Sequence, residues 1–478
     1  MKFSFPVRIF IVALVLRLIP VFLTRGLGIG LDDMFQYDML ARSLASGNGF
    51  RWYAQEDLDL LAPYVDFDLS TAQGYDPEYG LYTSFRAPLY PVFLAFVYFL
   101  NGLDFSRFFA ARLAQVIFLG APLAPLTYLV SRSLLPASEK AARISAWIVA
   151  CYPMLLVYPL GLGTENLFFV LLLSSFLFLL RSAETPSTFN LILSGILLAL
   201  TALTRSVILP FVILSFFVLF FLHRRRAILF IVAFIAVVSP WVIRNSLLHQ
   251  KLTGIKTSMG YNLYLGYHPE GDGSFIFGPS LDLLTIMDDS ERDKIGTQRA
   301  LGFIQAQPGR SVPLAVNRLG FFFGLEKRVL MYFYSNDILG FIPKPVLLTV
   351  SAILLLPFIL LSISAVFGLS LLRKNPRTIL LILLFASYIL PHVFILSEDR
   401  FHLALIPFFA ILAAYFWIGG LTGVFSRWQA SASGKVTVTF ALLACLLLLT
   451  NWGFELHRDA DKIAALLGPD GNRTYFPY

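Results

Sequence analysis

The 478-residue chain is 57% hydrophobic and only 14% charged, whereas soluble domains carry about 25% charged residues. This composition excludes a soluble globular protein and predicts an integral membrane protein. The formal net charge of +8 is spread over short Lys and Arg clusters between apolar runs, which excludes a basic nucleic-acid-binding face. The two cysteines, Cys151 and Cys445, lie far apart in apolar segments, so a disulfide framework and a cysteine zinc site are also excluded.

Apolar runs recur along the chain, and about 20 such residues suffice for a helix to cross a bilayer. The sequence predicts an all-α membrane bundle with about eleven transmembrane helices, within a range of roughly 10 to 13. The predicted spans are residues 6–24, 108–130, 144–160, 167–180, 191–203, 207–222, 228–243, 346–372, 378–396, 403–420 and 436–450. No small-residue cleavage site follows the first run, so we expect a retained helix and not a signal peptide.

The apolar segment 88–100 is expected to form a juxtamembrane or re-entrant helix, because about 13 residues that include Pro88 and Pro91 cannot cross the hydrocarbon core. With this segment not spanning the membrane and the N-terminus inside, every basic loop lies on the inner side, as the positive-inside rule requires. These loops contain Arg132, Lys140, Arg143, Arg224, Arg225, Arg226, Arg373, Lys374, Arg377, Arg427 and Lys435. The plasma membrane is the expected location.

Two long polar segments, 25–86 and 244–344, then share the external face with Glu165, Arg205 and Arg400. We therefore expect the chemistry at that face. Three regions are predicted, and they are a transmembrane catalytic module at 1–245 that includes the external loop 25–86, an external loop region at 246–345, and C-terminal transmembrane helices with an external tail at 346–478. Residues 318–334 mix apolar and charged side chains, which predicts an amphipathic helix lying at the interface.

The strongest local signal is the pair Asp32 and Asp33, directly after the first apolar run. A carboxylate at a membrane surface, next to a polar substrate, could act as a general base. Acidic residues also cap the first turn of a helix, where free N–H groups and the positive end of the dipole stabilise them. The pattern alone leaves both interpretations open.

A series of motifs follows in order along some 370 residues, each of them weak alone. The motifs are Asp33 with Tyr37, Ala41 and Gly47-Asn48-Gly49-Phe50; Arg86-Ala87-Pro88-Leu89-Tyr90-Pro91; Tyr158-Pro159 through Thr164-Glu165; Thr201 to Arg205; Pro240-Trp241 to Asn245; Gly260 to Gly266; and Arg400-Phe401-His402 to Pro407. This pattern resembles the GT-C type glycosyltransferases that use polyprenyl-phosphate sugars, in particular the protein O-mannosyltransferase and aminoarabinose-transferase-like group of glycosyltransferase family 39. The chain departs from the resemblance at Met34, where many relatives have a second acidic residue that Asp32 could replace.

The resemblance implies a lipid-linked sugar donor, with its tail in the bilayer, and transfer to an acceptor protein, lipid or glycan. Asp33 would be the general base, with Asp32 and Glu165 as further candidate catalytic residues. Cations must neutralise the leaving phosphate, and Arg400 is the first candidate, followed by Arg205 and Arg244. The sequence indicates no definite cofactor and leaves a divalent cation open, for which Glu165, His249 and His402 are candidate ligands if they do not contact the acceptor instead.

Other interpretations stay open at this point. Arg400 could form a simple loop ion pair with Glu398 or Asp399, and Glu165 could only start its helix. A flippase or transporter of lipid-linked sugars is the alternative function from another class, although two unequal external loops are unlike the repeated halves of transporters. A ligase that transfers whole glycans from a pyrophosphate lipid would differ from the first hypothesis only in its donor.

Overall fold

The computed structural model describes residues 4–67, 69 and 72–475, and these residues form a helical bundle with one very small sheet. Strands β1 (Arg51–Trp52) and β2 (Leu81–Tyr82) pair antiparallel. The helices of the first half are α1 (Phe5–Leu23), α2 (Asp33–Ala45), α3 (Gln55–Leu61), α4 (Leu89–Asn101), α5 (Ser106–Ala114), α6 (Leu123–Leu134), α7 (Glu139–Cys151), α8 (Pro153–Val157), α9 (Thr164–Glu184), α10 (Thr188–Thr204), α11 (Leu209–His223) and α12 (Ile228–Leu248). The second half contains α13 (Met259–Tyr267), α14 (Phe277–Asp282), α15 (Asp289–Ala306), α16 (Ser311–Phe322), α17 (Lys344–Leu371), α18 (Pro376–Phe394), α19 (Ile406–Ala430), α20 (Ala432–Arg458) and α21 (Ala460–Leu466).

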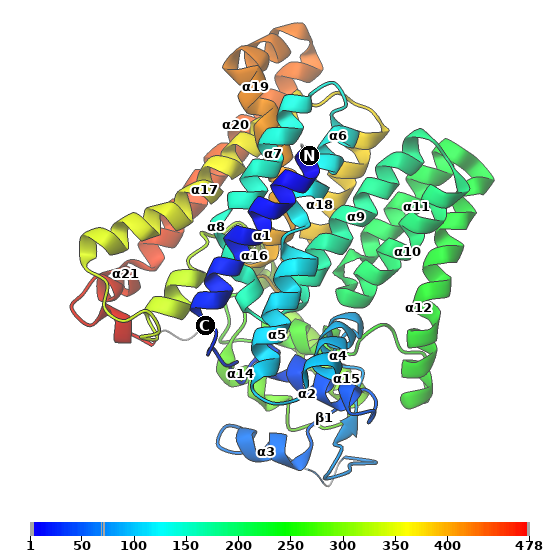
Figure 1. Cartoon of the computed structure of the whole chain (residues 1–478), viewed down its shortest axis with the longest axis vertical. Helices are drawn as coiled ribbons and strands as arrows, with labels where there is room; N and C mark the ends of the chain where they lie inside the picture. Colours follow the sequence, from blue (N-terminus) through cyan, green and yellow to red (C-terminus); the bar gives the residue numbers. More distant parts are fainter. Residues whose placement is uncertain (1–3, 68, 70–71, 476–478) are drawn as a thin grey trace.

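Within the described residues, 8 helical segments are long and apolar enough to cross a membrane, or 9 if the bent pair α7 and α8 is one span. One of the 8, Ser206–Leu248, contains both α11 and α12, which lie on either side of the turn Arg224–Ala227 (Figure 1). The shorter apolar helix α10 coincides with another predicted span. Every predicted span therefore coincides with apolar helix, which confirms the all-helical membrane fold, while the number that crosses stays a prediction.

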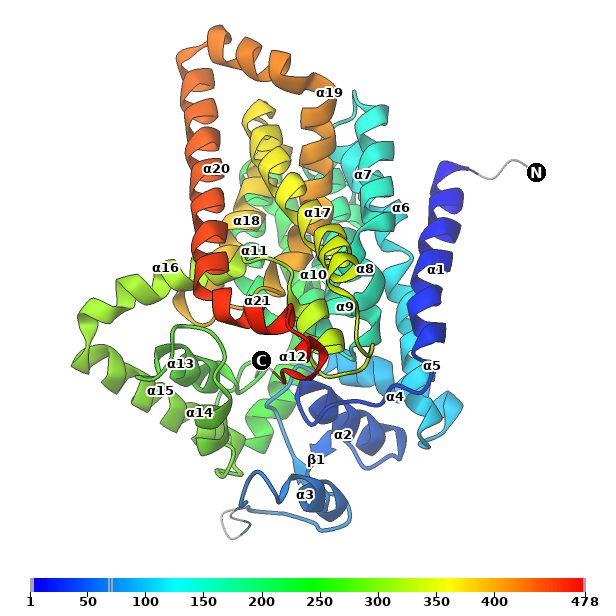
Figure 2. The ribbon, with the colours of Figure 1, turned by 90° about the vertical axis from the view of Figure 1, so that its left-hand side faces the viewer.

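The apolar segment after Arg86, predicted as a juxtamembrane or re-entrant helix, is the short helix α4, and it packs against α2. Helices α2, α3, α4 and α15 gather at one end of the bundle, and the start of α1 and the junctions α6–α7 and α19–α20 lie at the other (Figures 1 and 2). Gly420 has a positive φ of 58°, and α19 bends there, so that its last turns run across that second end (Figure 2). The bundle thus separates the polar segments from these basic junctions, as the predicted topology requires.

The amphipathic helix predicted at 318–334 is wrong. Helix α16 ends at Phe322, and a π-helical turn follows only at Leu330–Tyr334. The charged side chains between them do not face solvent, because Glu326 is buried and Arg328 is ion-paired with Glu398 and Asp399. Ion pairs with distant segments have replaced the polar helix face that the pattern suggested.

The core lies along α9 and the segment Phe401–Ala430. In the most apolar 18-residue stretch of each of these two segments, 61% and 78% of the residues are buried, whereas the share is 28% in both α17 and α20. Glu165 lies in the first turn of α9, and Arg400 directly precedes the segment Phe401–Ala430. The two most enclosed spans therefore carry two of the predicted site residues to the same end of the bundle.

Candidate active site

The two neighbouring aspartates at the start of α2 have different roles. Asp32 is the N-cap, since its Oδ1 accepts a hydrogen bond of 2.8 Å from the backbone N–H of Met34. Asp33 is the first helical residue, and its carboxylate accepts hydrogen bonds from Arg86 and Arg400. The capping interpretation therefore describes Asp32, whereas the role of Asp33 as general base stays a prediction.

Arg86 and Arg400 hold Asp33 from two sides. Arg86 Nη2 bonds to Asp33 Oδ1, and Arg86 Nε donates to Gln36 Oε1 at 2.8 Å. Arg400 Nη2 lies 3.4 Å from Asp33 Oδ2. Partial removal from water opposes ionisation of Asp33, but the two guanidinium charges outweigh it and hold the pKa of Asp33 well below its ordinary value. Asp33 is therefore ionised at neutral pH.

Arg400 also connects this aspartate to Glu165. Its Nε lies 3.8 Å from Glu165 Oε1 and 3.0 Å from Glu398 Oε2. That Nε is buried and, within the described part of the chain, has no hydrogen-bond partner of acceptable geometry. Arg400 thus joins three carboxylates, those of Asp33, Glu165 and Glu398.

Glu165 does more than start its helix. Its Oε1 forms an ion pair of 2.6 Å with Nη1 of Arg205, the residue directly after α10. Arg205 also donates a hydrogen bond of 3.3 Å to Thr164 Oγ1. The bundle therefore brings five predicted or motif residues into one cluster, here called the arginine cluster, which consists of Asp33, Arg86, Glu165, Arg205 and Arg400.

Arg328 supports the cluster from the side. It bonds to Glu398 Oε2 at 2.8 Å, so that one carboxylate oxygen lies between Arg328 and Arg400. Its neighbour Glu326 accepts a hydrogen bond from Tyr152 and is paired with His402 Nε2 at 3.1 Å. The loop before the segment Phe401–Ala430 is therefore held through several charged contacts.

Three predicted site residues lie elsewhere. Arg244 donates to the backbone oxygen of Thr83 at 2.6 Å, and His249 Nε2 lies 2.7 Å from Ser84 Oγ. His402 is fully buried, with its Nδ1 2.8 Å from Phe322 O. In the described ranges, no group of three or more His, Cys, Asp or Glu side chains is placed to hold a metal ion. The oxygens of Asp33 and Glu165 face guanidinium groups, which is unlike a cation site.

The sequence interpretation gave no role to two cations near the site. Arg86 was visible only as part of a motif, although it makes the closest contact to Asp33. Lys256 lies close enough to Arg86 and Arg205 for their charges to act on it. A single lysine in a polar loop carries no sequence signal for such a position.

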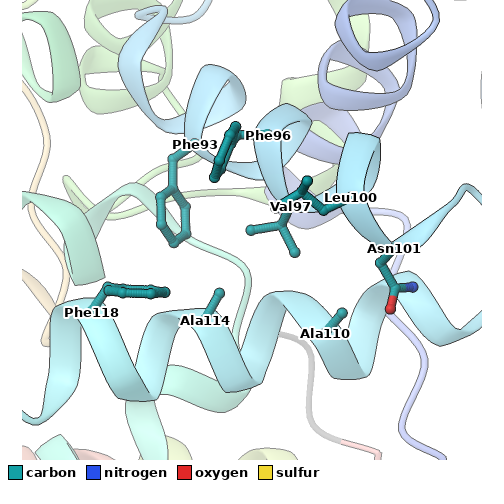
Figure 3. A pocket seen from close by; sticks show the side chains of 8 residues that line it. All are labelled: Phe93, Phe96, Val97, Leu100, Asn101, Ala110, Ala114 and Phe118. Atoms are coloured by element: carbon teal, nitrogen blue, oxygen red, sulfur yellow. The ribbon is translucent and has the colours of Figure 1, made fainter.

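An apolar groove of about 510 Å³ runs between α4 and the helix that follows it (Figure 3). Phe93, Phe96 and Val97 line it from α4, and Ala114 lines it from α5. Such a lining suits hydrocarbon rather than sugar or phosphate. The groove is therefore separate in character from the arginine cluster, although α4 begins three residues after Arg86.

Several solved structures are similar to the chain. Two are structures of the Archaeoglobus fulgidus oligosaccharyltransferase. One, tethered with an acceptor peptide containing the NVT sequon, has 16% identity and a TM-score of 0.47, and the match covers 99% of this chain and 59% of that chain. The other, AglB with an inhibitory peptide and a dolichol-phosphate, has 15% identity and a TM-score of 0.47, and the match covers 99% of this chain and 60% of that chain. A third, ArnT from Cupriavidus metallidurans bound to undecaprenyl phosphate, has 14% identity and a TM-score of 0.40, and the match covers 88% of this chain and 79% of that chain.

The chain spans about three fifths of the length of the two archaeal structures. No protein-family model matches the chain, and no curated protein matches it. The function proposed next rests on the residues of this chain alone.

Proposed function

We propose that the chain is a membrane glycosyltransferase that moves a monosaccharide from a polyprenyl-phosphate donor to an acceptor on the external face. The observation that carries this proposal is the arginine cluster, in which Arg86, Arg205 and Arg400 surround the carboxylates of Asp33 and Glu165. Glu398 also contacts Arg400, so three carboxylates face the three guanidinium groups, and Lys256 adds a further cation beside Arg86 and Arg205. A site rich in guanidinium groups at the end of apolar helices suits a phosphate that carries a hydrocarbon tail.

The reaction would be a single displacement at the anomeric carbon. The acceptor oxygen or nitrogen forms a bond to that carbon while the bond from carbon to the phosphate oxygen breaks, with inversion of configuration. The phosphate leaves with the bonding electrons, so it needs no proton from a general acid. Asp33 takes the proton of the acceptor group as the new bond forms.

Arg400 is the group we assign to the leaving phosphate. Its guanidinium lies 3.4 Å from Asp33 and 3.0 Å from Glu398, and a phosphate oxygen would take the place of one of these carboxylates. As phosphate draws Arg400 and Arg86 toward itself, their hold on Asp33 weakens, and the pKa of Asp33 rises toward its ordinary value. The bound donor would thereby turn an inert carboxylate into a usable base.

A transporter of the same lipid is the competing function. It would bind the donor without breaking the bond between sugar and phosphate. The test is transfer of radiolabelled sugar from a panel of polyprenyl-phosphate monosaccharides, with acceptor extract, by the purified protein in lipid. Release of polyprenyl phosphate by the wild type supports the transferase, and binding without release supports the transporter.

The matched variants are Asp33→Asn and Asp32→Asn. We expect Asp33→Asn to lower turnover about 100-fold or more, the range for removal of a general base. Asp32→Asn should retain most activity, because Asn caps a helix about as well as Asp. Equal turnover in the two variants would remove Asp33 from the role of base.

A further inference from the structure

Among the described residues, Lys256 has no ion-pair partner, whereas Arg86 and Arg205 beside it are both paired. It is half-buried and, among the residues that the structure describes, makes neither a side-chain hydrogen bond nor an ion pair. By contrast, Arg86 is paired with Asp33, and Arg205 is paired with Glu165. A half-buried ammonium group that has lost part of its water and gained no counterion is destabilised until an anion arrives.

The backbone holds Lys256 in place from both sides. The carbonyl of Ile255 accepts a hydrogen bond of 2.8 Å from Trp241 Nε1, and the N–H of Thr257 donates to Ser84 O at 3.0 Å. The hydroxyls of Ser84 and Thr257 are also 2.9 Å apart. Because Ser84 lies two residues before Arg86, these bonds bring the backbone of Lys256 close to Arg86 of the arginine cluster.

The surrounding charges agree with this placement. Burial and the positive charges of Arg86 and Arg205 lower the pKa of Lys256 to about 8, while Asp33 and Asp293 act in the opposite direction. The charges of Arg86 and Arg205 therefore act on Lys256 more strongly than those of Asp33 and Asp293. An anion bound at this position would relieve repulsion among three cations.

We propose that Lys256 binds the phosphate of the lipid donor, together with Arg400. This inference rests on the proposed function and names a further substrate-binding residue of the same site. Lys256 can turn to a phosphate without giving up a carboxylate, whereas each arginine must share its own. An ammonium group also binds phosphate as a point charge, which complements the planar fork of an arginine.

The experiment measures the affinity of the purified protein, in lipid nanodiscs, for polyprenyl phosphate at pH 7 and pH 9. The variants are Lys256→Gln and Lys256→Arg, and the matched control is Lys251→Gln, an exposed lysine of the same loop. The corresponding polyprenol, which lacks phosphate, and inorganic phosphate separate the contribution of the headgroup from that of the tail.

We expect Lys256→Gln to weaken binding of polyprenyl phosphate by about tenfold or more at pH 7, and to leave polyprenol binding unchanged. The wild type should lose about tenfold in affinity between pH 7 and pH 9, because Lys256 loses its proton above a pKa of about 8. Lys256→Arg should keep its affinity at pH 9, since arginine stays charged.

Affinity of Lys256→Gln equal to that of Lys251→Gln would overturn the inference, even if sugar transfer by the wild type stands. The inference would also be overturned if Lys256→Arg lost affinity for polyprenyl phosphate at pH 9 as the wild type does, because other groups would then cause the loss. Failure of wild-type sugar transfer, with the affinity pattern intact, would refute the proposed transferase and leave the phosphate site in place.

Discussion

Removal of the Arg400 guanidinium tests the assignment of the leaving phosphate. In Arg400→Gln the side chain keeps a hydrogen-bonding end but loses the charge that lies 3.4 Å from Asp33 and 3.8 Å from Glu165. A hydrogen bond to a charged group contributes about 1.5–3 kcal/mol, so donor affinity should fall roughly 10- to 150-fold. Loss of one donor that stabilises a developing anion costs about 100- to 1,000-fold in turnover.

The assay pairs a donor-binding titration with single-turnover sugar release, so that binding and chemistry are measured separately. Arg458→Gln is the control, because it removes one arginine from an ion pair of 3.4 Å with Asp459, which is outside the arginine cluster. Arg400→Lys should fall between the wild type and Arg400→Gln, since it keeps the charge and loses the fork. A donor affinity for Arg400→Gln within about twofold of that for Arg458→Gln would refute the assignment, because it falls below the range expected for a charged hydrogen bond.

Three further predictions concern topology, stability and pH. Cysteines at Glu56 and Lys294 should react with an impermeant thiol reagent in intact cells, whereas one at Lys140 should not; the opposite pattern would invert the orientation. Asp38→Ala should destabilise the protein by about 3–5 kcal/mol, read as a lower unfolding midpoint in detergent, because Asp38 is buried against Arg42 and Arg107. The pKa of Asp33 is lowered in the folded state, so ionised Asp33 stabilises the fold above its ordinary pKa near 4, and this stabilisation is lost as pH falls below that value. The difference in unfolding midpoint between the wild type and Asp33→Asn should therefore be constant from about pH 8 to 5 and shrink below about pH 4.

The fold could be predicted because membrane spans follow from local composition. About 20 apolar residues in a row specify a helix whatever its neighbours are, since unpaired backbone groups are too costly in hydrocarbon. The predicted run at 346–372, for example, coincides with α17. The helix predicted at 318–334 was wrong because its pattern of charges was compatible with a solvated face, and only the tertiary structure shows that Glu326 and Arg328 pair with other segments.

The candidate site could be predicted in part, from motifs and topology together. Asp33, Glu165 and Arg400 lie far apart in sequence, and the structure places them within ion-pair distance. Arg244 and His402 belong to the same motifs, but they satisfy backbone and buried partners instead. Motif membership indicates a residue's neighbourhood, whereas the direction of its side chain depends on packing that no local pattern encodes.

The paired state of the cluster bears on how a donor could enter it. Three guanidinium groups so close together would repel one another if Asp33 and Glu165 did not separate them. When a phosphate arrives, an arginine therefore exchanges its carboxylate partner for the phosphate. The arginines have already lost water to the carboxylates, so they do not pay for desolvation again. Lys256 differs, because it has no anion to exchange and gains the full interaction. We therefore expect the affinity for the donor to fall less steeply with salt concentration than the number of cations suggests. Lys256→Gln should lower the slope of this salt dependence more than Arg205→Gln does. Equal slopes in the two variants would mean that the arginines bind the phosphate without their carboxylates.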